Sequence, residues 1–434
     1  MKKQLLARAA SLLLILVLLC GTALPAAAAY DLPFTPSAED ESVYLQNLDN
    51  GEVLLAQNTA ERRYVASLTK SLTALMLLES GADLNTTITI PDRLTEEFKE
   101  IQNFNGADMK LKIGENIRLA DLLYGMLVPS ANDAASVVAD YLGAGSIDAF
   151  VQKMNERAAA LGCTNTTFTC PHGLYDQGNL STAEDMAKIA AACYANPQFM
   201  EVANTASYTV PADNMHTDER VLETTNPLIV PDSAYYRDTA RGIKTGFTTL
   251  AGRCYMTVAE KDGHHYLLVI LGAKKEGKNE TAYVYTEADQ IFDWIFSRFS
   301  DRTLLDANTA VSTVPLHGCD EADAISLYPA ESVTQYAYAD AVVEVKPELP
   351  DAVKAPVKAG DVEGTASVYL DGALIKTVDL VAKESYESAL LRGSLNALML
   401  VPVLLVVLIV LGVFTVLAGA NRRSAARART RRRG

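Results

Sequence analysis

The sequence lacks a C-x-x-C pair, a repeat of fixed period and an excess of positive charge. Without a C-x-x-C pair, it offers no ligand set for a zinc ribbon. The chain carries 38 Lys and Arg residues against 53 Asp and Glu residues, for a formal net charge of −15. Much of the positive charge lies in the two ends, so the body is more acidic still. Because phosphate binding needs a positive surface, this composition excludes nucleic acid as a partner.

The hydrophobic content is that of a folded protein. Hydrophobic residues make up 49% of the 434 residues and charged residues 21%, which excludes full disorder and predicts two or three domains. Six cysteines occur, and Cys20 lies in the N-terminal apolar run. The remaining five are an odd number and cannot all pair within one chain. Cys163 and Cys170 are close enough to be bridged in an oxidising compartment, and buried free thiols are the equal alternative.

The N-terminus has the pattern of a secretory signal peptide. Two lysines precede an apolar run that ends in a stretch of alanines. This pattern predicts a signal peptide over residues 1–29, with cleavage after Ala29. A lipoprotein site at Cys20 is disfavoured, because the bulky Leu19 stands where such sites have a small residue.

The C-terminus has the pattern of a membrane anchor. Residues 395–420 form an uncharged, strongly apolar run, and about 20 such residues cross a bilayer as a helix. The length disfavours the alternative of a buried core helix. Seven arginines follow within residues 421–434, so the positive-inside rule predicts a cytoplasmic tail. The body, residues 30–394, is then expected outside the cytoplasm, as the signal peptide also indicates.

The body alternates between strand and helix patterns. A hairpin is predicted at residues 42–56, around Asp49-Asn50-Gly51, and residues 67–200 have mostly helical periodicity. Strand patterns return after residue 205, followed by an amphipathic helix at residues 281–299. The predicted fold is therefore α+β, an antiparallel sheet built from both ends of a domain spanning residues 30–302, with a helical block inserted. Short apolar alternations predict a small β domain over residues 303–386.

The first chemical motif is Ser67-Leu68-Thr69-Lys70. Positions three apart lie on one face of a helix, so the Lys70 amine can reach the Ser67 hydroxyl. A serine needs a neighbouring base to become a nucleophile, and a lysine whose pKa is lowered by burial or by another cation can serve. Alone, the pattern is equally typical of an ordinary helix start.

Two further motifs follow at greater distance. Ser130-Ala131-Asn132 lies between two helical stretches, where it can face a cleft or simply cap the next helix. Lys244-Thr245-Gly246 is expected on an edge strand, where it can bind a substrate carboxylate and allow close approach of a substrate backbone. A backbone N–H near Phe247 and the backbone N–H of Ser67 can together form an oxyanion hole. The alternative is a solvent-facing lysine followed by a turn glycine.

Together and in this order, the three motifs resemble those of the serine D-alanyl-D-alanine carboxypeptidases among the low-molecular-mass penicillin-binding proteins. Their S-x-x-K, S-x-N and K-T-G triplet is an acyl-transfer signature shared with β-lactamases. The resemblance covers about residues 35–385 and implies a β-lactamase/transpeptidase-like sheet with its helical insertion. It is carried further by the segments Asp121–Leu127, Pro171–Leu174, Ala251–Cys254 and Ala355–Gly360.

The resemblance implies catalytic roles for three residues. Ser67 would be the acylated nucleophile, Lys70 its general base, and Ser130 the relay that passes a proton to the departing D-alanine. His172 suggests a Ser-His-Asp triad instead, but Lys70 already supplies a base and Pro-His-Gly is typical of a structural segment.

The resemblance also implies binding roles. Asn132 would position the substrate or Lys70, Lys244 and Thr245 would hold the terminal carboxylate, and Gly246 and Phe247 would contact the substrate. The substrate would be the D-Ala-D-Ala end of peptidoglycan stem peptides, and β-lactam antibiotics would acylate the same serine. No metal or cofactor is needed.

Three alternatives use the same residues differently. A β-lactamase is disfavoured, because no E-x-x-L-N segment occurs between Ser130 and Lys244. A D,D-endopeptidase would cut cross-links with the same triplet and remains open. A cell-wall scaffold without turnover would show a broken triplet, and here it is intact. The expected location is the bacterial cell membrane, with a single span in the lipid and the catalytic domain outside.

Overall fold

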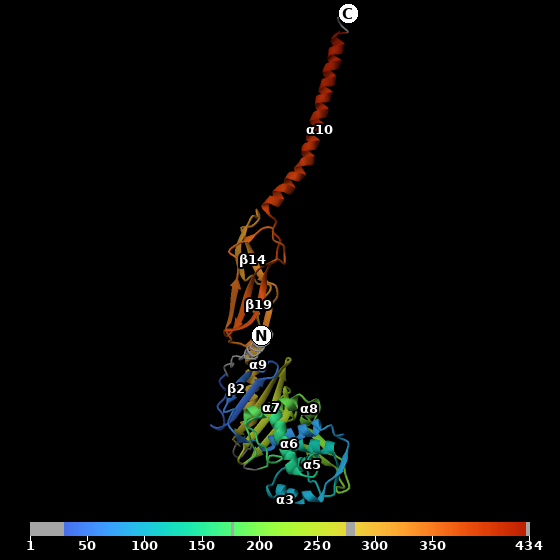
Figure 1. Cartoon of the computed structure of the whole chain (residues 1–434), viewed down its shortest axis with the longest axis vertical. Helices are drawn as coiled ribbons and strands as arrows, with labels where there is room; N and C mark the ends of the chain where they lie inside the picture. Colours follow the sequence, from blue (N-terminus) through green and yellow to red (C-terminus); the bar gives the residue numbers. More distant parts are fainter. Residues whose placement is uncertain (1–29, 175–177, 275–282, 431–434) are drawn as a thin grey trace, which may run out of the picture. The chain divides into compact units, whose positions relative to one another are not determined.

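The computed structural model describes residues 30–174, 178–274 and 283–430. The predicted signal peptide lies outside the described residues, as do the last four residues of the Arg-rich tail. The chain divides into two compact units between Phe296 and Ser297. Unit 1 contains all three sequence motifs, and unit 2 begins with strands and ends with a long helix (Figure 1).

Unit 1 is built on a five-stranded antiparallel sheet with the order β2-β1-β11-β10-β9. The strands are β1 (Ser42–Asn47), β2 (Val53–Gln57), β9 (Ala240–Thr248), β10 (Gly252–Lys261) and β11 (His264–Ala273). The N-terminal hairpin, blue in Figure 1, therefore pairs with strands from the far end of the unit. This arrangement confirms the predicted fold class, and it leaves β9, with its Lys-Thr-Gly motif, at an edge.

The central strand β11 is apolar along its length because both faces of the sheet are covered. Leu267, Val269 and Leu271 belong to the main core, where β11 contacts helix α7 (Ala183–Tyr194). Residues of opposite parity face helix α9 (Tyr283–Arg298), and the ring of Tyr266 packs on that of Phe296. A continuous apolar run thus indicates a strand between two helical layers.

The inserted block is helical, as predicted. Its helices are α2 (Thr69–Glu79), α3 (Thr95–Asn103), α4 (Leu119–Leu127), α5 (Asn132–Leu142), α6 (Ile147–Ala160), α7 and α8 (Pro197–Ala203). Short ribbons that the periodicity did not predict interrupt it: β3 (Arg63–Tyr64) with β6 (Leu180–Ser181), and β4 (Thr87–Thr89) with β5 (Asn116–Arg118). A further ribbon, β7 (Ser207–Val210) with β8 (Arg220–Glu223), precedes β9.

Unit 2 contains a six-stranded sheet with the order β16-β18-β19-β14-β13-β17, and a separate pair, β12 with β15. The strands are β12 (Phe299–Leu305), β13 (Ser312–His317), β14 (Ala324–Pro329), β15 (Val333–Tyr338), β16 (Val343–Glu348), β17 (Val353–Lys354), β18 (Val362–Leu370) and β19 (Ala373–Ala382). Asp371 and Gly372 join β18 to β19 with φ values of +47° and +81°, the left-handed conformation that a tight hairpin turn needs.

Helix α10 (Ala389–Thr430) ends the described chain. Within it, residues 398–422 are long and apolar enough to cross a membrane, and none of this stretch is buried against protein. The side chains that it exposes are mostly Leu, Val and Ile. A C-terminal helix of this composition fits the predicted membrane anchor.

Candidate active site

Ser67 and Lys70 meet at the start of helix α2. Ser67 lies in the short 3₁₀ turn Ala66–Leu68 that leads into the helix, so one turn separates the two side chains. Lys70 Nζ lies 2.8 Å from Ser67 Oγ. It also donates to Asn132 Oδ1 at 2.6 Å and to the His172 carbonyl at 2.7 Å. These contacts hold the amine against the hydroxyl, as the motif predicts.

The environment of Lys70 favours its neutral form. The side chain is fully buried, and loss of hydration disfavours the charged amine. Burial first, and then the positive charge of Lys244, lower the pKa of Lys70 well below its ordinary value of 10.5. A neutral lysine amine within hydrogen-bond distance of a serine hydroxyl can accept its proton.

Ser130 and Asn132 lie at the turn between helices α4 and α5. Ser130 has a φ of +66°, which is uncommon for a residue with a Cβ, and its hydroxyl is buried with no hydrogen-bond partner among the described residues. Asn132 Nδ2 donates to the Ala107 carbonyl at 2.8 Å. The capping alternative is wrong, because Ala131 is the N-cap of α5 and no side chain caps it. The turn instead presents one hydroxyl and one amide to the site.

Strand β9 runs past the nucleophile. A Cβ on Gly246 would lie 3.1 Å from the Ser67 nitrogen, so glycine lets the strand approach that backbone closely. Thr245 Oγ1 lies 2.5 Å from Thr225 Oγ1. Lys244 is buried and donates to the Thr245 carbonyl at 2.9 Å, and burial lowers its pKa to about 7. The motif therefore has two parts: Thr245 and Gly246 line the pocket, and Lys244 lies behind them.

These residues surround a pocket of about 620 Å³. Of the predicted site residues, Ser67, Ser130, Asn132, Thr245, Gly246 and Phe247 line it, whereas Lys70 and Lys244 lie behind its wall. The sequence analysis missed several residues that line the pocket, and these are Phe104, Leu174, Thr225, Leu250, Arg253 and Tyr285. They come from five separate segments. Leu250 and Arg253 lie six and nine positions after Lys244, and Leu174 ends the segment Pro171–Leu174.

Comparison with known proteins decides the family. A family model described as D-alanyl-D-alanine carboxypeptidase matches residues 32–275, and one described as the penicillin-binding protein 5 C-terminal domain matches residues 299–388. The chain belongs to the D-alanyl-D-alanine carboxypeptidase family. The fold class and the enzyme class predicted from the sequence, a serine-type D-Ala-D-Ala carboxypeptidase, are thereby confirmed.

Individual relatives agree along most of the chain. The D-alanyl-D-alanine carboxypeptidase DacF of Bacillus subtilis is 28% identical over 81% of this chain and 87% of its own length. DacA of Escherichia coli is 29% identical over 84% and 89%, respectively. Among solved structures, penicillin-binding protein 5 of Haemophilus influenzae matches with a TM-score of 0.56 and 25% identity, covering 83% of this chain and all of that one.

In this carboxypeptidase, His172 supports Lys70 rather than activating Ser67. Its carbonyl accepts from Lys70, its Nε2 lies 3.2 Å from Glu97 Oε1, and its Nδ1 lies 3.1 Å from the Leu174 nitrogen. Burial opposes its charge, yet the neighbouring Cys170 and Glu97 raise the pKa of His172 to about 9. Both ring nitrogens are thus used away from Ser67, and the triad alternative finds no support in the geometry.

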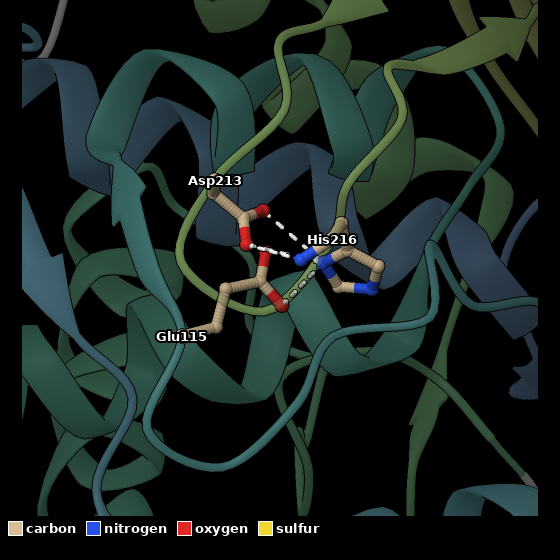
Figure 2. Close-up of side chains that lie close together, drawn as sticks. All are labelled: Glu115, Asp213 and His216. Atoms are coloured by element: carbon tan, nitrogen blue, oxygen red, sulfur yellow. Dashed lines mark hydrogen bonds and ion pairs between the residues drawn. The ribbon is translucent and has the colours of Figure 1, made fainter.

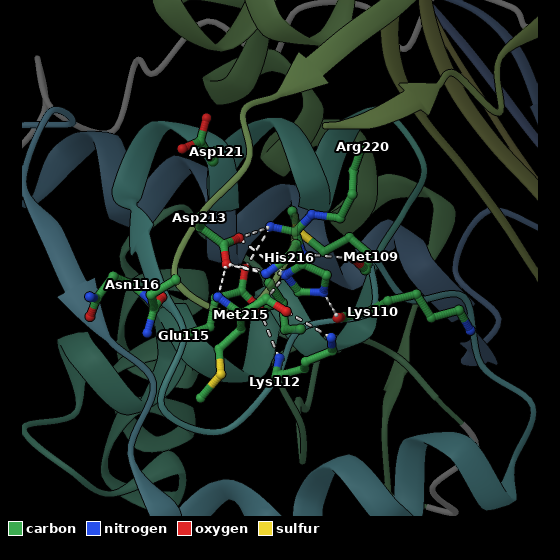
Figure 3. Close-up of polar contacts among 12 residues, drawn as sticks. Met109, Lys110, Lys112, Glu115, Asn116, Asp121, Asp213, Met215, His216 and Arg220 are labelled. Atoms are coloured by element: carbon green, nitrogen blue, oxygen red, sulfur yellow. Dashed lines mark hydrogen bonds and ion pairs between the residues drawn. The ribbon is translucent and has the colours of Figure 1, made fainter. Parts of the chain in front are cut away.

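The carboxypeptidase also contains a cluster with metal-ligand spacing. Glu115, Asp213 and His216 point toward one another, and one ligand atom of each lies within 4.8 Å of the others (Figure 2). Arg220, however, donates to Glu115 Oε1 at 2.6 Å and to Asp213 Oδ2 at 3.0 Å (Figure 3). Its guanidinium also reaches the Met109 carbonyl at 3.2 Å. The guanidinium already pairs with both carboxylates. The cluster therefore links the β7–β8 ribbon to the loop before β5 through ion pairs.

The cysteines of the catalytic unit are free thiols. Cys163 and Cys170, for which the sequence left a bridge open, are unpaired, and so are Cys193 and Cys254. Cys170 accepts from the Gly173 N–H at 3.3 Å and stands beside His172. Burial opposes ionisation, but His172 lowers the pKa of Cys170 below its usual value.

Proposed function

We propose that the protein removes the terminal D-alanine from peptidoglycan stem peptides through an acyl-enzyme on Ser67. The observation that carries this proposal is a buried Lys70 amine, favoured in its neutral form, 2.8 Å from the Ser67 hydroxyl at the wall of a pocket. The family membership supplies the substrate class, since the curated relatives are D-alanyl-D-alanine carboxypeptidases.

In the acylation step, Lys70 accepts the Ser67 proton as Oγ attacks the carbonyl carbon of the penultimate D-alanine. The developing oxyanion would be held by the backbone N–H groups of Ser67 and Phe247, which the close approach at Gly246 brings together. The peptide C–N bond then breaks. The leaving amine takes a proton relayed from Lys70 through the free hydroxyl of Ser130.

In the deacylation step, water attacks the ester carbonyl and gives up a proton to the same base. The ester bond breaks, Ser67 regains its proton, and the shortened peptide leaves with a new carboxylate. Asn132 would orient both Lys70 and the substrate amide, because its oxygen already accepts from Lys70 Nζ and its nitrogen faces Ala107. Thr245 would bind the substrate carboxylate, and Lys244 would act through its charge.

The same machinery explains why such a protein binds penicillins. A β-lactam presents a strained amide and a carboxylate in the geometry of D-Ala-D-Ala, so it acylates the same serine. A D,D-endopeptidase would use the same residues on a cross-linked peptide. No observation on the pocket favours it over the carboxypeptidase, so it stands as the second outcome of the assay.

We propose a location to match this substrate. The signal peptide would export residues 30–394, helix α10 would span the cell membrane once, and the Arg-rich tail would stay in the cytoplasm. Residues 30–302 would carry the chemistry, and residues 303–386 would act as a spacer from the membrane. In cells stripped of wall, external protease should spare an epitope placed after Gly434. Its cleavage would contradict the spanning topology.

The decisive assay uses the full-length protein in detergent. It should release free D-alanine from an acylated L-Lys-D-Ala-D-Ala peptide and should bind one fluorescent penicillin per chain. Ser67→Ala should abolish both activities while leaving the circular dichroism spectrum unchanged. Labelling of Ser67→Ala at the wild-type level would show that the nucleophile is a different residue. Release of a cross-linked partner peptide in preference to D-alanine would favour the endopeptidase.

A further inference from the structure

The pocket contains an unexplained positive charge. Among the described residues that line it, Arg253 is the one with a charged side chain. Within the described part of the chain no carboxylate forms an ion pair with it, and its Nε is buried without a hydrogen-bond partner. A guanidinium that has lost water at Nε and has no partner carries a desolvation cost, which an incoming anion would relieve.

The position of Arg253 is set by the sheet. It lies on β10 directly opposite Phe247 of β9, so the two side chains share one face. Its guanidinium carbon lies 4.9 Å from the centroid of the Phe247 ring, a cation–π contact that restricts the long side chain. The ring itself is 39% exposed at the pocket. Arg253 is therefore held on a platform beside the substrate strand.

Lys244 cannot fill the same role directly. It is 2% exposed, its Nζ donates to the Thr245 carbonyl, and it lies outside the pocket lining. Its charge instead lies where it lowers the pKa of Lys70. The Lys-Thr-Gly motif thus brings a hydroxyl to the pocket surface but leaves the cation behind the wall.

Among the described residues that line the pocket, no carboxylate competes for Arg253. Thr225, Thr245 and Tyr285 also line the pocket, and Tyr285 donates from its hydroxyl to the Thr225 carbonyl at 3.3 Å. Burial raises the pKa of Tyr285 to about 12, so this phenol stays neutral. The region therefore combines one unpaired guanidinium with hydroxyl groups, a donor set suited to a carboxylate.

We propose that Arg253, together with Thr245, binds the C-terminal carboxylate of the substrate and so selects peptides with a free carboxyl end. This inference rests on the proposed function. It assigns carboxylate binding to Arg253 instead of Lys244, whose positive charge lowers the pKa of the base Lys70. A planar guanidinium binds a carboxylate through two parallel hydrogen bonds, which fixes the orientation of the leaving D-alanine as well as its charge. Peptides with a neutral end lose that orientation.

The test compares two peptides that differ only at the carboxyl end. Full-length protein is assayed with an acylated L-Lys-D-Ala-D-Ala and with the same peptide as its C-terminal carboxamide. Wild type should prefer the carboxylate. Arg253→Gln should lower kcat/KM for the carboxylate peptide by about 10- to 100-fold and leave that for the carboxamide unchanged. Arg253→Lys keeps the charge but lacks the planar guanidinium. Its kcat/KM for the carboxylate peptide should therefore lie between those of wild type and Arg253→Gln.

Matched controls separate the possible failures. Arg62 is exposed and donates to Thr167 Oγ1 at 3.0 Å outside the pocket, so Arg62→Gln should keep the wild-type preference. Rates are normalised to penicillin labelled at saturation, which counts folded active sites in every variant. If Arg253→Gln keeps the wild-type preference for the carboxylate, the inference is overturned and the proposed function stands. If wild type releases no D-alanine and takes up no penicillin, both are overturned.

Discussion

The two units differ in whether they bury polar side chains. Among the described residues, every buried polar or charged side chain lies between Glu41 and Glu287, in unit 1. Unit 2 has an apolar core that includes Leu327, Val368 and Leu380, and its charged side chains lie at the surface. Burying an ionisable group costs stability unless it is paired or neutralised. Unit 1 therefore carries costs that unit 2 avoids, and several of the buried groups belong to the active site.

Some of the buried groups that cost stability in unit 1 are the groups that the proposed reaction uses. Lys70 and Lys244 have fully buried amines, and burial lowers the pKa of each. Asp133, next to Asn132, is buried as well, and burial raises its pKa to about 6 although three backbone N–H groups donate to it. Perturbed groups that surround a pocket are typical of catalytic sites. In unit 2, one described group, Tyr386, has a resolved pKa shift.

The largest expected effect comes from removing the base. Arg cannot lose its proton near neutral pH, so Lys70→Arg should slow acylation of Ser67 by about 10,000-fold. Lys244→Arg keeps a positive charge and should retain part of the activity. Stopped-flow labelling with a fluorescent penicillin measures both rates. Equal losses in the two variants would contradict the assignment of Lys70 as the base and of Lys244 as a residue that acts through its charge.

The proton relay should have a smaller effect. Ser130 presents a buried hydroxyl with no partner among the described residues, poised to pass a proton to the leaving amine. Ser130→Ala should lower kcat for D-alanine release by about 100-fold, because water can partly replace the hydroxyl. Ser71, also buried with an unpartnered hydroxyl but on α2 away from the pocket lining, offers the control. Similar losses in Ser71→Ala would remove the case for a specific relay.

The motifs predicted the chemical core of the site because local geometry determines it. Ser67 and Lys70 are one helical turn apart, so their contact follows from spacing alone. Thr225, Arg253 and Tyr285 reach the pocket from three segments, and their meeting depends on how the α9 layer and the β7–β8 ribbon pack on the sheet. A single sequence carries no direct signal for such contacts. The position of Lys244 behind the wall was missed for the same reason, since the strand pattern does not give the direction of a long side chain.

The fold followed from periodicity where elements are long. The β10–β11 hairpin and α9 have continuous apolar runs or clear helical spacing, and the sheet with its inserted helices is confirmed. The two- and three-residue ribbons of unit 1 are too short to show a period of two. The positive φ of Ser130 also has no sequence signal, because serine rarely adopts it and the surrounding packing imposes it.

A cavity in the core of unit 2 should not change the rate of Ser67 acylation. Leu380 is fully buried in the core of unit 2, so Leu380→Ala should lower the free energy of unfolding of that unit by about 2–5 kcal/mol. Penicillin acylation should keep its wild-type rate. Trp294, the one tryptophan, lies in α9 of unit 1, so its fluorescence reports unit 1, while circular dichroism also follows unit 2. A lower acylation rate in Leu380→Ala would show that the units are coupled.

The smallest expected effect concerns a buried acid pair far from the nucleophile in sequence. Glu41 and Glu287 are both buried, and each accepts from the Ser37 N–H at 3.0 Å. The other oxygen of each is buried with no hydrogen-bond partner among the described residues. Burial and the negative charge of Glu41 raise the pKa of Glu287 to about 8 from its ordinary value of 4.5. The folded protein therefore holds a proton between pH 4.5 and 8 that the unfolded chain releases.

Because the native state binds the extra proton in that range, the stability of unit 1 should fall as pH rises from 4.5 to 8 and then level off. Glu287→Gln keeps an oxygen for the Ser37 N–H and adds a donor for Glu41, so it should abolish this decline and leave stability at pH 8 equal to or above wild type. Denaturant unfolding followed by Trp294 fluorescence at pH 6, 7 and 8 measures the slope. Glu344 is exposed in unit 2, so Glu344→Gln should keep the wild-type slope. An undiminished slope in Glu287→Gln would assign the proton to a different group of unit 1.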